Sequence, residues 1–356
     1  MVKAERQSRT HVPVLGVTRR SAELSSRFIA QSAFILGGTG QIGRAVARRL
    51  LDAGWDVAVG ARTPRETEAR FVQVDRREDK QLAAAIGDGV DVLVDVIAFT
   101  DEDARQLVAL GDRVGSVVAM STAAVYEDEA GRSLDTQETR FPVFPMPIRE
   151  GQRTVRPGDS TYATRKVAME RILLESDLPS TILRPCAVHG PGASSPRELY
   201  FSKRALDGRK VVLLSHRGET RFHTTSAANL AELVWLAAER PGRRVLNCGD
   251  RDPPTVLEIA RAIAAALGVG WAEVLLPGQP SGGIGETPWS GPSSLVLCMQ
   301  EAERELSYQP VATYAGAVAD TVQWLVEVRP QPTSYMTGMF DYVSEDRFLA
   351  TLQRTR

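Results

Sequence analysis

A run of closely spaced glycines near the start of the chain constrains the fold more than any other feature. An apolar stretch covers residues 33–36, and Gly37-Gly-Thr-Gly-Gln-Ile-Gly43 comes directly after it. From Gln41 to about Leu51, apolar residues recur with the period of a helix. A strand, a tight glycine turn and a helix in this order are the context in which a glycine fingerprint binds a dinucleotide.

Each glycine has its own expected role in such a turn. Gly37 permits the tight bend, Gly40 lets the backbone approach a pyrophosphate, and Gly43 lets the helix pack closely on the strand. The amides at the helix start, including those of Gln41 and Ile42, would hold the phosphates together with the positive end of the helix dipole. The alternative is a glycine-rich turn with a structural role only.

Length and charge limit the class of partner. The 356 residues are enough for one large domain or for two that share a core. No apolar run approaches the 18 residues that a transmembrane helix needs, and the net charge of −1 creates no global field that attracts nucleic acid or a membrane surface. We therefore expect a small-molecule substrate, with no nucleic-acid and no membrane partner.

The three cysteines, Cys186, Cys248 and Cys298, are isolated in the sequence. Their spacing matches neither a disulfide framework nor a zinc site, so we expect no metal and a reducing, cytoplasmic setting. Residues 1–30 contain acidic residues and no apolar core of a signal peptide, which favours an N-terminal extension before the first strand.

Apolar runs alternate with amphipathic segments over the first half of the chain. The pattern predicts strands at 55–62, 70–75, 91–98, 116–121 and 180–184, and helices at 80–86, 101–110 and 162–176. Strands that are apolar throughout and alternate with helices form a parallel sheet that is covered on both faces. The predicted fold class is therefore α/β, with a doubly wound parallel sheet.

The second half of the chain is less regular. A proline-rich stretch at 127–159 and a segment at 277–292 are expected to be loops. Helices are predicted at 229–239, 256–267 and 312–328, a strand at 244–247, and one short helix near 344–353. We infer a dinucleotide-binding domain at 31–188, with a contribution from about 224–249, and a smaller substrate-binding domain from 189–223 and 250–330. An N-terminal extension at 1–30 and a C-terminal tail at 331–356 flank these domains.

Two side chains suited to proton transfer lie four residues apart, in Tyr162-Ala-Thr-Arg-Lys166. This spacing places a phenol and an ammonium group on one face of a helix. A phenol, whose ordinary pKa is about 10, becomes a usable acid or base when a nearby cation favours the phenolate. The alternative is an exposed pair of helix residues with no chemical role.

With these motifs in place, the chain resembles the extended short-chain dehydrogenases/reductases of the NAD-dependent epimerase/dehydratase type. Four motifs carry the resemblance in family order across residues 33–328: the glycine turn, Ser121-Thr-Ala-Ala-Val-Tyr126, Tyr162-x-x-x-Lys166, and Leu183-Arg-Pro-Cys-Ala-Val-His-Gly-Pro-Gly192. The resemblance implies a Rossmann fold for the dinucleotide-binding domain. It also implies a homodimer formed through a four-helix bundle that includes the helix with the tyrosine and the lysine.

The resemblance also implies roles for individual residues. Thr122 would hydrogen-bond the oxygen of the substrate, and Tyr162 would be the general acid and base. Lys166 would bind the hydroxyls of the nicotinamide ribose and lower the pKa of Tyr162. Asp75 would face the adenine, and the three fingerprint glycines would bind the pyrophosphate. Hydride would pass between the nicotinamide and a carbinol or carbonyl carbon of the substrate.

Arg62 decides which dinucleotide the sequence favours. It lies about 19 residues after Gly43, where an enzyme specific for NAD carries an acidic residue that holds the ribose 2′-hydroxyl. An arginine at this position accommodates a 2′-phosphate, so NADP is preferred and NAD is the alternative.

Departures from the family pattern narrow the reaction. Family dehydratases and decarboxylases carry an acidic residue where this chain has Ala123 and Ala124, so these two activities are disfavoured. We expect a structural role for His189 and a small core residue in Cys186. Arg221 resembles the arginine that grips the diphosphate of a nucleotide sugar in the family.

The leading hypothesis is an NADP-dependent ketoreductase or epimerase that acts on a sugar nucleotide or a related hydroxylated metabolite. The alternative is a non-catalytic, NADP-sensing regulatory or scaffold protein. The intact set of Thr122, Tyr162 and Lys166 favours the enzyme, because a sensor does not need all three. The sequence leaves the choice between reductase and epimerase open.

Overall fold

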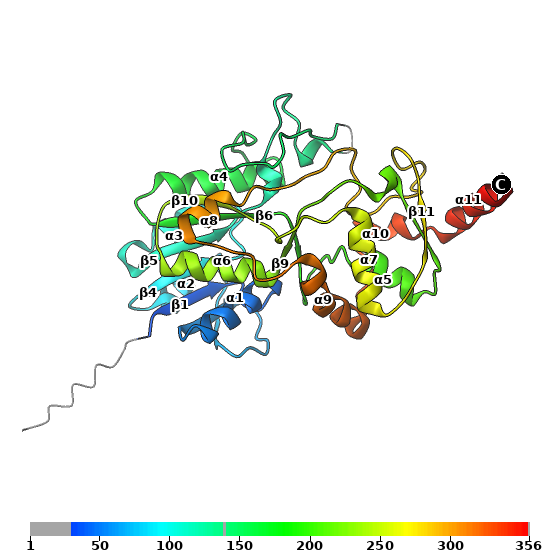
Figure 1. The fold of residues 1–356 in the computed structure, drawn as a ribbon. Helices are drawn as coiled ribbons and strands as arrows, with labels where there is room; N and C mark the ends of the chain where they lie inside the picture. Colours follow the sequence, from blue (N-terminus) through cyan, green and yellow to red (C-terminus); the bar gives the residue numbers. More distant parts are fainter. Residues whose placement is uncertain (1–29, 138–139, 355–356) are drawn as a thin grey trace, which may run out of the picture. The chain divides into compact units, whose positions relative to one another are not determined.

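The computed structural model describes residues 30–137 and 140–354, and within them seven parallel strands form one sheet (Figure 1). The order of the strands is β3-β2-β1-β4-β5-β6-β10. Their bounds are Ser32–Leu36 for β1, Asp56–Ala61 for β2, Arg70–Gln73 for β3, Val90–Asp95 for β4, Val114–Met120 for β5, Ser180–Pro185 for β6 and Arg244–Cys248 for β10. The predicted doubly wound sheet is confirmed, whereas the predicted extension lies outside the described residues apart from Ala30.

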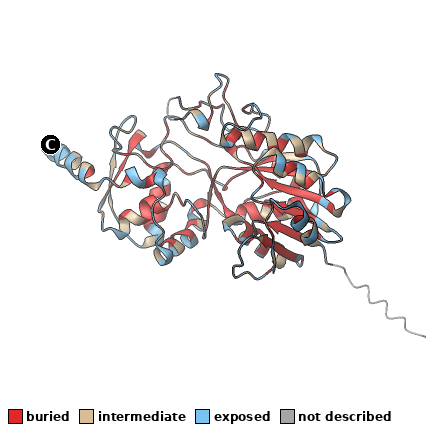
Figure 2. Ribbon diagram, turned by 180° about the vertical axis from the view of Figure 1, so that it is seen from behind, coloured by how far each residue is buried: buried red, intermediate tan, exposed pale blue. Residues whose placement is uncertain are grey.

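Helices cover both faces of this sheet because its side chains alternate between two apolar clusters. In β1, Ala33 and Ile35 belong to one cluster and Phe34 and Leu36 to the other. The first cluster includes α1 (Gln41–Asp52) and α6 (Ala227–Glu239); the second includes α2 (Asp79–Ile86), α3 (Asp101–Val108) and α4 (Tyr162–Glu175). Figure 2 shows the strands between these helices as buried.

One further helix, α8 (Gln300–Leu306), packs on the same face as α1 and α6. Ala302, Leu306 and Tyr308 are buried in the cluster of that face. No helix was predicted here, because residues 300–306 contain only two apolar residues, Ala302 and Leu306, and so show no clear helical period. This part of the span 250–330, which was expected to belong to the substrate-binding domain, therefore contributes to the cover of the sheet.

A second core lies outside the sheet. It is built by α5 (Leu199–Leu206), α7 (Val256–Leu267), α9 (Tyr314–Val328) and β8 (Val211–Leu214), and β8 pairs in parallel with β11 (Ala272–Leu275). The predicted α7 and α9 are present. The sequence pattern missed α5, β8 and β11, which are short and depend on tertiary packing more than on local preference.

The residues after Arg329 are more than a tail with one helix, which corrects the sequence prediction. They form α10 (Ser334–Thr337) and α11 (Tyr342–Arg354). Met336 and Met339 are buried in the second core, and Glu345 is buried against Arg204. A few separated buried side chains leave no periodic pattern, so the sequence could not reveal this packing.

The long segment 127–159 is a loop, as predicted, with one short 3-10 turn at Leu134–Thr136 among its described residues. Phe144 and Ile148 pack against Leu295 and Leu297, so two distant loops lie side by side. A small two-stranded sheet joins β7 (Ala187–His189) and β9 (Thr224–Ser226). Among the described helices, none has the length and apolar character to cross a membrane.

Candidate active site

The predicted site residues meet where the order of the strands reverses. The glycine turn follows β1, a segment at 97–100 follows β4, and Thr122 follows β5, at the carboxyl edge of three neighbouring strands. In open α/β sheets, ligands bind outside this edge at such a switch point. The predicted strand at 91–98 ends earlier, at Asp95, because the Asp95 carboxylate accepts hydrogen bonds from the backbone of Ile97 and Ala98.

The glycine turn has the geometry that its sequence predicts. Gly37 has a φ of +79°, which favours glycine, and its carbonyl accepts a hydrogen bond from the N–H of Gly40 at 3.1 Å. A Cβ on Gly43 would collide with the Gly37 carbonyl and the Gly38 backbone. Gly43 therefore permits the close approach of α1 to the turn.

The start of α1 is free to receive an anion. Gly40 is the N-cap, no side chain caps the helix, and no acidic residue lies in its first turn. The first backbone bond of the helix joins Arg44 N–H to Gly40 O, so the amides of Gln41, Ile42 and Gly43 have no carbonyl four residues back in the helix. This arrangement fits the pyrophosphate of a dinucleotide.

Two of these glycines make a matched pair of variants. A methyl group on Gly40 would have its nearest neighbour at an ordinary 3.5 Å, so Gly40→Ala should keep the stability of the protein and weaken dinucleotide binding. Gly43→Ala should destabilise the fold by about 1–3 kcal/mol through overpacking. Thermal unfolding and fluorescence titration with NADPH measure both effects. Equal losses of stability in the two variants would contradict this assignment.

Arg62 is exposed just after β2, and only its carbonyl is engaged, by Gln73 Nε2 at 3.1 Å. Among the described residues, its guanidinium forms no hydrogen bond or ion pair within 4 Å, so its charge is free for a ligand. Asp75 is held by Arg77, which donates to it from Nη2 at 2.7 Å and from Nε at 3.1 Å. The hydrogen bonds from Arg77 lower the pKa of Asp75 to about 2.

Tyr162, at the start of α4, lies close to Thr122, which follows β5. Tyr162 is the first residue of α4, whose capping box uses Thr161 and Thr164, and its side chain is 48% exposed. The Thr122 hydroxyl accepts from the Ala124 N–H at 3.1 Å, and it lowers the pKa of the Tyr162 phenol, so the two hydroxyl groups lie close enough to interact. Burial raises the pKa of Tyr162, and the interaction with Thr122 opposes this rise.

Lys166 lies one turn further along α4 and is 5% exposed. Its ammonium donates to Ala98 O at 2.6 Å and to Met120 O at 2.8 Å, which leaves one N–H for a ligand. Burial lowers the pKa of Lys166 to about 8, although Asp95 and Glu170 favour its charged form. A buried Lys166 contradicts the alternative of an exposed helix pair.

One implied effect is absent from this geometry. The family resemblance implies that Lys166 lowers the pKa of Tyr162, yet here the pKa of Tyr162 lies above its ordinary value. The Lys166 ammonium is 5.9 Å from the centre of the phenol ring and is directed to two carbonyl groups instead. Desolvation therefore outweighs the cation at this distance.

Sequence reasoning missed the segment that follows β4. Ala98 accepts a hydrogen bond from Lys166, and the ring of Phe99 lies 5.5 Å from the ring of Tyr162. The available signal was Asp95, an acidic residue that ends an otherwise apolar run of strand residues.

The family positions that depart from the pattern have structural roles. Ala123 is buried and carries no acid or base. Burial raises the pKa of Cys186 to about 12, which keeps a neutral thiol beside the apolar cluster of Tyr126 and Phe144. His189 is 1% exposed and its Nε2 lies 2.8 Å from Asp250 Oδ2, so it belongs to a buried polar network, as predicted.

Arg221 is engaged by residues other than the predicted catalytic side chains. Its guanidinium donates to Pro253 O and lies 3.6 Å from Glu258 Oε2, at the start of α7. Among the described residues, no contact joins Arg221 to Tyr162 or Lys166. The structure therefore brings Thr122, Tyr162, Lys166 and the glycine turn to one edge of the sheet, with Arg221 engaged elsewhere.

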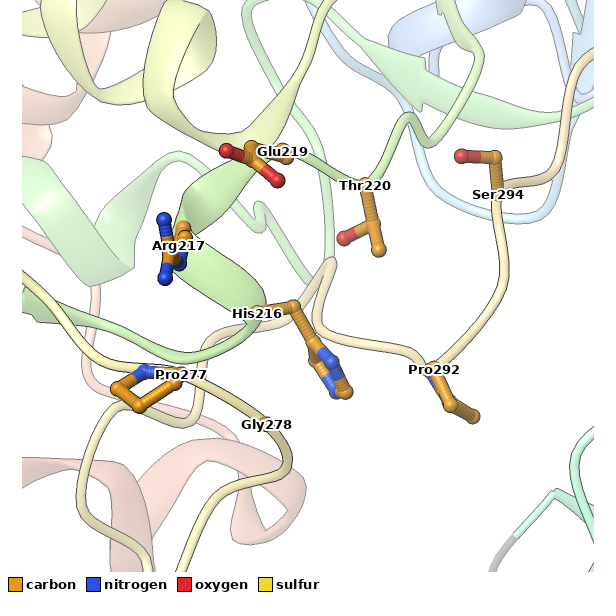
Figure 3. Close-up of a pocket in the computed structure, with 8 residues that line it drawn as sticks. All are labelled: His216, Arg217, Glu219, Thr220, Pro277, Gly278, Pro292 and Ser294. Carbon is orange, nitrogen blue, oxygen red and sulfur yellow. The ribbon is translucent and has the colours of Figure 1, made fainter.

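A polar cavity of about 370 Å³ lies beside Arg221, over the second core. Its lining residues are His216, Arg217, Glu219, Thr220, Pro277, Gly278, Pro292 and Ser294 (Figure 3). His216 and Arg217 both have positive φ values, of +48° and +55°, which are strained for residues with a side chain. Figure 3 shows the His216 ring between the segments that carry Gly278 and Pro292. Neither Tyr162 nor Lys166 lines this cavity.

Comparisons with known proteins agree with this geometry. A sequence profile of the family described as "NAD dependent epimerase/dehydratase family" matches residues 33–249. No curated protein sequence matched the chain.

Solved structures with the same fold include UDP-N-acetylglucosamine 4-epimerase from Bacillus cereus, at 19% identity and a TM-score of 0.65, over 84% of this chain and 100% of that one. The Bordetella bronchiseptica enzyme WbmG in complex with NAD matches at 18% identity and a TM-score of 0.64, over 89% and 99%. UDP-glucose 4-epimerase from Thermotoga maritima, with UDP-glucose, matches at 18% and 0.63, over 84% and 100%. At these identities, the likeness shows a common fold.

Proposed function

Because the chain belongs to the NAD dependent epimerase/dehydratase family, we propose that it is an NADP-dependent oxidoreductase acting at a carbinol or ketone carbon. The observation that carries the proposal is the position of Lys166, which is buried one helical turn from the half-exposed Tyr162 and donates to the carbonyls of Ala98 and Met120, with the glycine turn at the same edge of the sheet. A bound nicotinamide dinucleotide would supply the hydride donor or acceptor.

Tyr162 and Thr122 are suited to transfer the proton and to bind the substrate oxygen. Tyr162 is half-exposed, so its hydroxyl can reach a substrate oxygen and exchange a proton with it. Thr122 accepts from a backbone amide, which leaves its own proton to donate to the phenol or to the substrate oxygen. With alanine at 123 and 124, no second acid or base adjoins Thr122. This supports reduction, or epimerisation by oxidation and re-reduction, over dehydration and decarboxylation.

Several residues are suited to hold the dinucleotide. Gly37, Gly40 and Gly43 shape the turn, and the amides of Gln41 and Ile42 face the place of the pyrophosphate. The third N–H of Lys166 would bind a ribose hydroxyl. Asp75 lies after β3, near the expected adenine, and Arg62 would bind a 2′-phosphate.

The preference for NADP gives a quantitative prediction. Arg62→Ala should raise the KM for NADPH by about tenfold or more, since a hydrogen bond to a charged group contributes about 1.5–3 kcal/mol. The KM for NADH should stay unchanged. Arg65→Ala, another exposed arginine of the same loop, is the matched control. Equal or better use of NADH by the wild-type protein would overturn the preference.

For the substrate we propose a sugar nucleotide or a related hydroxylated metabolite. Two of the similar solved structures are named as epimerases of UDP sugars. The cavity in Figure 3 supports a polar group, because His216, Arg217 and Glu219 supply a ring nitrogen, a guanidinium and a carboxylate. Arg221, which is held by Glu258, would join that group only after releasing this partner.

The amount of NADPH consumed for each molecule of product tests the proposal. The purified protein is incubated with NADPH and a panel of ketones and UDP sugars, and both cofactor and product are measured. A reductase consumes one NADPH for each product, whereas an epimerase returns its cofactor in every cycle. NADPH binding without turnover of any panel member, together with an intact biological effect in Tyr162→Phe, would favour the alternative of a non-catalytic sensor.

The homodimer and the cytoplasmic location stay predictions from the sequence.

A further inference from the structure

Three charged side chains from three segments form a largely buried bridge behind the active site, in which the side chains of Arg76 and Asp103 are 10% and 22% exposed. Arg76, which follows β3, donates from Nη1 to Asp95 Oδ2 at 2.6 Å, and its Nε lies 3.1 Å from Asp103 Oδ1. Asp95 ends β4 and its side chain is fully buried, whereas Asp103 lies in the first turn of α3. We call Asp95, Arg76 and Asp103 the carboxylate bridge.

The carboxylate bridge holds the backbone of segment 97–100. Asp95 Oδ1 accepts from the first two N–H groups of this segment, at 2.9 and 2.7 Å. Asp103 Oδ2 accepts from the next two, at 2.7 and 3.0 Å. Hydrogen bonds to a charged acceptor are about twice as strong as neutral ones. Four consecutive amides are therefore held by two carboxylates, and Arg76 ties the two carboxylates together.

The same segment contacts both side chains that carry the proposed chemistry. The carbonyl of Ala98 accepts from Lys166 Nζ at 2.6 Å. The ring of Phe99 packs against the ring of Tyr162, with 5.5 Å between the centroids and 33° between the planes. A displacement of segment 97–100 would therefore move both the carbonyl that binds Lys166 and the ring that packs against Tyr162.

We propose that Arg76, Asp95 and Asp103 are positioning residues, which set the places of Lys166 and Tyr162 through segment 97–100. The inference rests on the proposed function, in which those two side chains are catalytic. A buried group of three charges is costly to desolvate and gives little stability by itself. Its position behind the two catalytic side chains accounts for it better than a contribution to stability does.

The charges around Lys166 support this role. Asp95 and Asp103 both favour the charged form of Lys166, although burial raises the pKa of Asp95 itself, a rise that Arg76 and the N–H groups of Ile97 and Ala98 oppose. Glu170, on the helix of Lys166, acts in the same direction, whereas Arg76 opposes it. Removing one carboxylate of the bridge should therefore lower the pKa of Lys166 further.

The test uses the full-length protein with isotope-labelled lysine, because the chain contains only five lysines and Lys166→Arg assigns the signal. The pKa of Lys166, which burial already lowers, should fall further by about 1 or more in Asp95→Asn, since the removal of a nearby opposite charge shifts a pKa by that amount. Asp101→Asn is the matched control. Asp101 pairs with the exposed Arg105 on the same helix, and its loss should leave the pKa of Lys166 unchanged.

Two further readouts complete the design. Amide hydrogen exchange of segment 97–100 should become at least about tenfold faster in Asp95→Asn, and kcat should fall about tenfold at neutral pH. Arg76→Lys keeps the charge but loses the bridging geometry, and it serves as the test if Asp95→Asn does not fold. It should accelerate the same exchange and lower kcat.

The outcomes separate this inference from the proposed function. An unchanged pKa of Lys166 with unchanged exchange would overturn the positioning role, whatever the turnover. Changes in both with full kcat would show that the bridge sets the surroundings of Lys166 without affecting turnover, which would overturn its role in the proposed reaction. If the wild-type protein has no turnover, the proposed function fails, while the titration and the exchange still decide whether the bridge positions Lys166.

Discussion

Tyr162→Phe should lower turnover by about 10²–10⁴-fold, the usual loss when a positioned acid or base is removed. The variant deletes only the hydroxyl that meets Thr122, and the ring can still pack against Phe99. Binding of NADPH should therefore stay close to the wild-type level. Initial rates with the best substrate of the panel, together with a fluorescence titration of NADPH, measure the two quantities separately.

A matched control is available on the second core. Tyr335 is exposed to a similar extent, 53% against 48% for Tyr162, and its hydroxyl contacts only Pro288 O among the described residues. Tyr335→Phe should leave the rate unchanged. A Tyr162→Phe protein with the wild-type rate would show that proton transfer occurs elsewhere.

Removal of Glu345 should produce the second large effect, on stability. Arg204 is buried in the second core, with its side chain 2% exposed, and Glu345 accepts from its two terminal nitrogens at 2.8 and 2.6 Å. Glu345→Gln leaves a buried guanidinium without its counter-charge. The expected cost is about 3–5 kcal/mol in the free energy of unfolding, measured by urea denaturation.

Two variants show whether the buried charge is the cause. Asp346 also pairs with an arginine of the same region, Arg209, but its side chain is 61% exposed, so Asp346→Asn should leave the free energy of unfolding close to the wild-type value. Combining Arg204→Met with Glu345→Leu removes both charges and should recover much of the loss. Equal costs for Glu345→Gln and Asp346→Asn would contradict the assigned role of burial.

The sheet could be predicted from the sequence because its information is local. Each central strand is an apolar run, such as residues 116–120, and the strands at 33–36, 70–75 and 91–98 are each followed by a segment with helical period. The glycine turn needs only its own backbone and the neighbouring helix, so its conformation also follows from the residues present. By contrast, α5 and β8 depend on their packing in the second core, and short segments of this kind leave no clear pattern.

The catalytic set was predicted in the same local way. Tyr162 and Lys166 are four residues apart on one helix, so their spacing alone places them on a common face. The partners of Lys166 could not be predicted, because Ala98 and Met120 supply backbone carbonyls, which no residue type signals. Arg221 resembles the family arginine that binds a diphosphate. The sequence did not show that its guanidinium lies 3.6 Å from Glu258, on a different element.

The sequence by itself determined the order of β1 to β6 and of α1 to α4, the glycine turn and the spacing of the tyrosine and the lysine, since all of these depend on neighbours within a few residues. Only the tertiary structure decided the surroundings of those two side chains. The carboxylate bridge joins residues 76, 95 and 103 from three segments, and its geometry exists only once the sheet has brought those segments together. Burial, which sets the pKa of Lys166, likewise depends on the whole fold and not on any single segment.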